Sequence, residues 1–142
     1  MPALATILAA VFVVLALLHA YWAFGGTFGK AAAIPEINGA PAFEPSAAGT
    51  MLVAAGLLAC ALVIGIAAGL TNGSGDLRGL AGWVAYGLAA ALLLRAVGEF
   101  RLVGFFKRVR GSAFSRMDDF VYSPLCVALA LAIVVLLQNP GA

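Results

Sequence analysis

The chain has 142 residues, of which 64% are hydrophobic and 10% are charged, and its formal net charge is +2. A soluble domain has roughly a quarter of its residues charged, so this chain cannot cover a globular surface and the bilayer is its expected solvent. The small net charge gives no argument for nucleic acid. Cys60 and Cys126 lie in separate apolar segments without metal-ligand or redox spacing. We therefore expect an all-α membrane protein with membrane lipids as partners, and no cofactor, metal or nucleic acid.

Four apolar segments are long enough to cross a bilayer: residues 4–24, 47–70, 80–100 and 120–137. Each has about 18 to 24 residues, which at 1.5 Å per residue reaches across a hydrocarbon core of about 30 Å. The first segment has no Lys or Arg before it and no clean cleavage site after it, so we expect a retained helix rather than a signal peptide. The sequence predicts one domain, residues 1–142, folded as a four-transmembrane-helix bundle.

The connections between these segments differ in length and character. Residues 25–46 contain four glycines and three prolines and are expected to be mostly irregular. Residues 71–79 form a short polar turn, and residues 101–119 are basic and aromatic. Because the two long connections lie on the same side of the membrane, the helices are expected to form two hairpins in a two-plus-two arrangement.

The distribution of basic residues predicts the orientation. One side carries six of them and the other side carries only Arg78; the six are Lys30, Arg101, Lys107, Arg108, Arg110 and Arg116. Loops rich in Lys and Arg stay in the cytoplasm, so we expect both long loops inside and both termini outside. Arg101, Lys107, Arg108 and Arg110 lie near Phe105 and Phe106 and are expected to contact anionic lipid headgroups, at about 1 kcal/mol per basic residue.

The third segment carries two ionisable residues near its end, Arg95 and Glu99. An ionisable side chain inside a membrane helix costs about 2.5 to 3.5 kcal/mol on insertion scales, so it persists where another group compensates it. One helical turn separates the two residues, which predicts that they share a face. We expect them to face the bundle interior, with His19, Asp118 or Tyr122 as partner. The alternatives are a self-compensating structural pair and side chains that extend to the interface.

A candidate ligand-binding site follows from depth in the membrane: His19, Trp22, Arg95, Glu99 and Tyr122 are all expected near the cytoplasmic ends of their helices. So many polar groups at one level are unusual in a chain with so few of them. Each also has a structural interpretation, because a histidine can be a buried hydrogen-bonding group and aromatic side chains form belts at the interface. No residue is assigned a catalytic role.

Pro124 bears on where the fourth helix begins. A helix starting there would have about 14 residues and a length of about 21 Å, too short to span. We therefore expect the helix to begin near Asp118, with Pro124 inside it and the Phe120 carbonyl without its usual donor. The alternative is Ser123 as the N-cap and Pro124 in the first turn.

Several motifs together resemble one family. They are His19-Ala-Tyr-Trp-Ala-Phe-Gly-Gly26, Ile34-Pro35, Arg95-Ala-Val-Gly-Glu-Phe-Arg-Leu-Val-Gly-Phe-Phe-Lys107, Phe114, Asp118 and Tyr122-Ser-Pro-Leu125. They look like a family of small bacterial four-helix membrane proteins known as domain of unknown function 3995, and the resemblance covers nearly the whole chain. It implies a polytopic bacterial membrane protein of four helices, which we expect in the inner membrane, and it carries over no activity.

Three classes of function remain open from the sequence. The first is the binding or transport of a small anionic or lipid-like ligand at a cytoplasm-facing polar cluster. The second is an accessory subunit of a larger membrane complex or a homo-oligomer, with the cluster as a structural feature. The third is a small membrane enzyme, an isomerase or hydrolase, with Glu99 or His19 as general base. An enclosed, hydrated pocket around Glu99 would favour the first or third class.

Overall fold

The computed structural model describes residues 1–71 and 73–139, which are mostly helical. Its long helices are α1 (Pro2–Ala23), α3 (Ala47–Ala67), α4 (Gly75–Val97) and a continuous run of α5 (Ala113–Met117), η1 (Asp118–Tyr122) and α6 (Ser123–Gln138). Between α1 and α3 lie α2 (Lys30–Ala33) and the two antiparallel strands β1 (Glu36–Ile37) and β2 (Ala40–Pro41). The four long helices are long and apolar enough to cross a membrane. The all-α, multi-pass prediction is confirmed.

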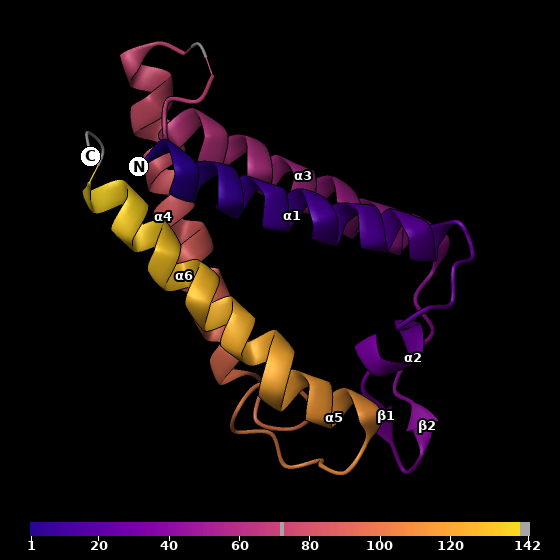
Figure 1. Cartoon of the computed structure of the whole chain (residues 1–142). Coiled ribbons are helices and arrows are strands. Elements are labelled where there is room, and N and C mark those ends of the chain that lie inside the picture. Colours follow the sequence, from indigo (N-terminus) through magenta and orange to yellow (C-terminus); the bar gives the residue numbers. More distant parts are fainter. Residues whose placement is uncertain (72, 140–142) are drawn as a thin grey trace.

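The helices form two hairpins that diverge from one end of the molecule (Figure 1). Helix α1 packs along α3, and α4 packs along α6. The two pairs meet at the end that holds the start of α1, the connection between α3 and α4 and the end of α6. At the opposite end they separate, and α2 packs against α5 across the opening. The predicted two-plus-two arrangement is confirmed.

The hydrophobic core lies where the hairpins meet. Helix α4 contributes two small buried residues, Ala85 and Ala89, while larger side chains come from the other helices: Phe12 from α1, Ile64 from α3 and Ile133 from α6. Alanines at a helix interface let the backbones approach closely, which is the usual source of packing energy between helices in lipid. The core therefore holds the closed end of the two hairpins, and at the other end the hairpins diverge.

Serine caps explain where three helices begin. The Ser46, Ser74 and Ser112 side chains accept hydrogen bonds from backbone N–H groups in the first turns of α3, α4 and α5, over 3.0, 3.3 and 3.0 Å. The Ser112 cap starts the fourth helical run at Ala113, earlier than the sequence predicted. The preceding connection therefore covers residues 98–112.

The third helix ends earlier than predicted. It stops at Val97, because Gly98 has a φ of +86° and turns the chain away. Gly104, at a φ of +88°, packs directly against Gly98, and the Phe105 N–H donates to the Ala96 carbonyl over 2.8 Å. Residues after Val97 thus form a tight loop, and the predicted continuation of the helix through Phe100 is wrong.

The fourth helical run contains Pro124 and a π-helical turn before it. The turn covers Asp118–Tyr122, and the Ser123 N–H donates to the Asp118 carbonyl, five residues back. A π-helical turn shifts the hydrogen-bond register at the point where proline removes a donor. The expectation that Pro124 lies inside the helix is confirmed, and the alternative of Ser123 as the N-cap of a separate helix is wrong.

Candidate functional site

The Asp118 carboxylate, on the π-helical turn, is fully buried. Oδ1 accepts from Arg95 Nη2 over 2.8 Å and from Ser123 Oγ over 3.1 Å. Oδ2 accepts from Lys107 Nζ over 3.0 Å and from the Gly104 N–H over 2.7 Å. A buried carboxylate is tolerated only when it is paired and hydrogen-bonded. Four donors from three segments meet that requirement here.

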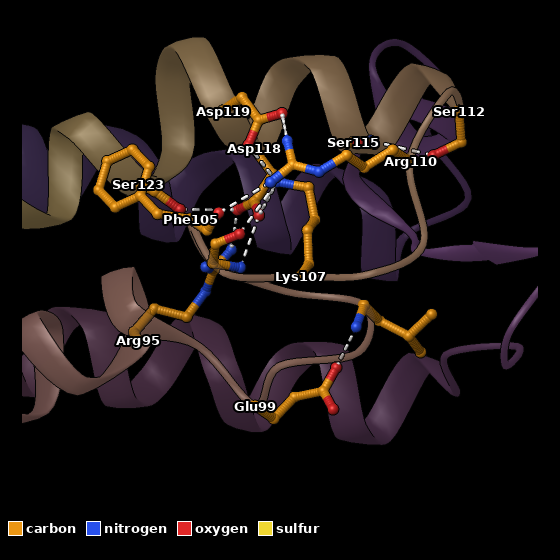
Figure 2. A network of polar contacts seen from close by, with 12 residues as sticks. Arg95, Glu99, Phe105, Lys107, Arg110, Ser112, Ser115, Asp118, Asp119 and Ser123 are labelled. Atoms are coloured by element: carbon orange, nitrogen blue, oxygen red, sulfur yellow. Dashed lines mark hydrogen bonds and ion pairs between the residues drawn. The ribbon is translucent and has the colours of Figure 1, made fainter.

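The ion cluster, defined as Arg95, Lys107, Arg110, Asp118 and Asp119, extends this arrangement towards the surface (Figure 2). Asp119 pairs with Lys107 and, over 3.1 Å, with Arg110. Arg110 also donates to the Phe105 carbonyl over 2.9 Å. Three cations thus face two carboxylates, so the cluster retains one uncompensated positive charge.

The ion cluster fastens α4 and the 98–112 connection to the start of the fourth helical run. Arg95 comes from α4, Lys107 and Arg110 come from the connection, and both aspartates lie on η1. The expectation that the ionisable residues of the third segment have a partner on the fourth helix is confirmed for Arg95, whose partner is Asp118.

Glu99 is not part of this cluster, and its predicted interior pairing is wrong. It lies beyond the end of α4 and is exposed. Its carboxylate accepts from the Leu102 N–H within the tight loop, and Figure 2 shows it lying apart from the aspartates. Because the helix stops at Val97, Arg95 and Glu99 do not share a helix face.

The predicted headgroup residues divide into two groups. Lys107 is 2% exposed and bound between Asp118 and Asp119, so its expected contact with lipid headgroups is wrong. Moving the buried ammonium to a lipid headgroup would break its ion pairs and leave the buried Asp118 carboxylate without one of its cations, which is strongly destabilising. Arg101 and Arg108 are exposed, and the Arg110 side chain is 55% exposed although it is paired.

A cavity of about 630 Å³ lies between the hairpins, where they diverge. Most of its wall is apolar, and leucines from four segments line it: Leu15, Leu57, Leu92, Leu125 and Leu129. Of the five residues predicted to bind a ligand, His19, Trp22, Arg95 and Tyr122 line this cavity and Glu99 does not. The shared depth inferred from the sequence therefore corresponds to one cavity lined by these four side chains.

Hydrogen bonds fix the aromatic residues at the end of the cavity that lies next to the connection between α1 and α3. Trp22 Nε1 donates to the Phe28 carbonyl over 2.8 Å, and its ring meets the His19 ring edge-on, with the centroids 5.0 Å apart. Tyr122 Oη donates to the Ala32 carbonyl over 3.2 Å. These bonds attach the connection between α1 and α3 to both hairpins, so that it covers one end of the cavity.

Arg95 takes part in both the ion cluster and the cavity. Its side chain is 34% exposed and contributes to the cavity wall. Nη2 is paired with Asp118, whereas Nη1 is buried and has no hydrogen-bond partner among the described residues. Buried N–H donors in proteins nearly always have a partner, and leaving one without costs about 1 to 3 kcal/mol.

Among the described residues, no group of three or more His, Cys, Asp or Glu side chains is placed to hold a metal ion. No curated protein and no solved structure matches the chain. The model of one protein family, described as a protein of unknown function (DUF3995), matches residues 12–133. That match includes the cavity wall and the ion cluster and extends over most of the chain, which therefore belongs to the DUF3995 family.

Proposed function

We propose that this membrane protein binds an anionic, lipid-like amphiphile in the cavity between its two hairpins. The observation that carries the proposal is the cavity itself. Its volume of about 630 Å³ lies in the range of about 300 to 1,000 Å³ typical of small-molecule sites. Its composition also fits that class of site, which combines mostly apolar walls with a few polar groups that orient the ligand.

The apolar part of the ligand is assigned to the leucine-lined wall. Leu57 and Leu92 come from different hairpins, and Leu129 comes from the core end of the fourth helix. An alkyl chain placed among them removes apolar surface from water, which stabilises the complex by roughly 25 cal/mol per Å². In a bilayer this gain is reduced, because lipid tails compete for the same surface. Selectivity must therefore come from the polar end.

The anionic part of the ligand is assigned to Arg95. The ion cluster retains one positive charge, and the unpartnered Nη1 atom belongs to the cation that lines the cavity. A hydrogen bond from a guanidinium to an anionic oxygen is roughly twice as strong as one between neutral groups. A negatively charged head beside the Arg95 side chain would therefore compensate this charge.

The enzyme hypothesis loses its Glu99 base in this arrangement. Glu99 is exposed, lies outside the cavity wall and is bonded to the Leu102 N–H. His19 remains in the cavity, with no carboxylate bonded to it among the described residues. Binding is therefore the function that the cavity supports best.

For the membrane context we propose a bacterial inner membrane with both long connections in the cytoplasm. The proposal rests on the six basic residues of these connections and the helical run that follows, against Arg78 alone on the other side. In a background without Cys60 and Cys126, a membrane-impermeant thiol reagent added to intact cells should label Thr71→Cys and leave Arg108→Cys unlabelled. Labelling of the Arg108 variant alone would reverse the topology.

Native mass spectrometry in mild detergent tests the ligand proposal. The wild-type protein should retain an anionic amphiphile, whereas Val53→Trp, which places an indole in the cavity wall, should lose it. Leu52→Trp is the matched control, because Leu52 is 74% exposed and does not line the cavity. A protein that carries no amphiphile and instead retains a stoichiometric protein partner would contradict the proposal and favour an accessory subunit.

A further inference from the structure

The polar groups of the cavity wall differ in whether they still have hydrogen-bonding capacity. Two of them have no donor to spare: the Trp22 N–H is given to the Phe28 carbonyl, and the Tyr122 hydroxyl proton is given to the Ala32 carbonyl. Arg95 retains the Nη1 donor. The hydrogen-bonding requirements of a ligand in this cavity therefore depend on Arg95 and on the remaining polar side chain, His19.

The protonation of the His19 ring follows from its backbone contact. Nδ1 lies 2.8 Å from the Leu15 carbonyl oxygen. A carbonyl oxygen can only accept, so Nδ1 must carry the proton of this hydrogen bond. In the neutral imidazole the other nitrogen, Nε2, is then an acceptor with an available lone pair. The α-helix thus fixes the tautomer through the carbonyl four residues earlier.

His19 Nε2 has no hydrogen-bond partner among the described residues, and the side chain lines the cavity at the same end as Trp22. Because Nε2 has no partner and is not one of the buried atoms, it is accessible, in contrast to Arg95 Nη1. The imidazole is held in place on two sides, by the Leu15 carbonyl and by the edge-on Trp22 ring. It is a fixed acceptor in the wall of a mostly apolar cavity.

We propose that the ligand head carries a hydroxyl donor as well as an anionic oxygen. The anionic oxygen pairs with the guanidinium of Arg95, which lines the cavity, and the hydroxyl donates to His19 Nε2. This inference rests on the proposed function and specifies its ligand class: a hydroxylated anionic amphiphile, for example one with a glycerol-like head. A site that hydrogen-bonds a ligand hydroxyl rejects an analogue that lacks it, because the bound analogue would cover Nε2 and leave it unpaired.

The test uses two probes with the same alkyl chain and the same single negative charge. Alkyl phosphoglycerol has hydroxyl donors, and alkyl methyl phosphate has none. In nanodiscs of neutral lipid, the wild-type protein should bind the first at least about tenfold more tightly than the second. His19→Phe keeps a ring beside Trp22 without an acceptor and should bind both equally. His19→Gln, which restores an acceptor oxygen, should recover the preference.

Equal affinity of the wild-type protein for the two probes, or an unchanged preference in His19→Phe, would overturn this inference. Val53→Trp separates that failure from a failure of the cavity proposal. If Val53→Trp weakens both probes while the wild type shows no preference, the cavity binds amphiphiles and the hydroxyl assignment is wrong. If His19→Phe does not fold, the wild-type preference and the His19→Gln variant still decide the question.

Discussion

Replacing Asp118 with alanine is expected to lower the free energy of unfolding by about 3 to 5 kcal/mol, the range typical of removing one partner of a buried ion pair. The variant leaves buried Lys107 without one of its two carboxylates and leaves the guanidinium of Arg95 unpaired. It also removes the acceptor of the Gly104 N–H. Denaturant titration in detergent, followed by circular dichroism, measures the loss.

Two other aspartates serve as controls for this prediction. The Asp119 side chain is 24% exposed, so Asp119→Ala should cost clearly less than Asp118→Ala. Asp76 is exposed in the first turn of α4, where its interaction with the helix dipole is worth about 0.3 to 1 kcal/mol. Similar losses in all three variants would show that the buried carboxylate has no special role in fastening the 98–112 connection.

Gly98→Ala and Gly104→Ala are expected to be at least as damaging, and to act through sterics rather than charge. A Cβ on Gly98 would overlap the Val103 carbonyl oxygen, and one on Gly104 would overlap the Val97 carbonyl oxygen. At Gly98 the φ of +86° and ψ of −177° also belong to a region that is essentially restricted to glycine, which costs about 1 to 3 kcal/mol by itself. We expect sharply reduced yield of folded protein, measured by fluorescence-detected size exclusion.

The variant Gly111→Ala distinguishes the conformational cost of a positive φ from the cost of steric overlap. It has a φ of +97°, but a Cβ there would meet no atom within 4 Å. Gly111→Ala should therefore show only the conformational cost of about 1 to 3 kcal/mol, without the overlap. If Gly98→Ala and Gly111→Ala proved equally stable, the close contact between the two ends of the tight loop would not be a determinant of folding.

Much of the fold is predictable from sequence because lipid imposes strict rules. Apolar length identifies four spans, and loop lengths imply two hairpins. The exact helix ends are harder to predict from apolar length. Apart from Arg95 and Glu99, the third segment is apolar through Phe100, but the backbone turns at Gly98, where Gly104 packs against it. A contact between two glycines leaves no trace in hydropathy.

The candidate site was partly predictable for a related reason. Rare polar residues such as His19 and Arg95 stand out in an apolar chain, and both line the cavity. The sequence does not reveal which charges are paired. Lys107 belongs to a basic run typical of a membrane surface, but the tight loop that begins at Gly98 brings it to Asp118. Two adjacent aspartates at the start of an apolar helix are the one signal that pointed to such a partner.

Binding of an anionic amphiphile between the hairpins is tested most directly by titrating one such probe, alkyl phosphoglycerol, into wild-type protein, Val53→Trp and Leu52→Trp in neutral nanodiscs. We expect Leu52→Trp to match the wild type, and Val53→Trp to bind at least about tenfold more weakly, equivalent to about 1.4 kcal/mol. Melting temperatures of the three proteins exclude general unfolding as the cause. Equal affinities for all three proteins would contradict the cavity as the binding site.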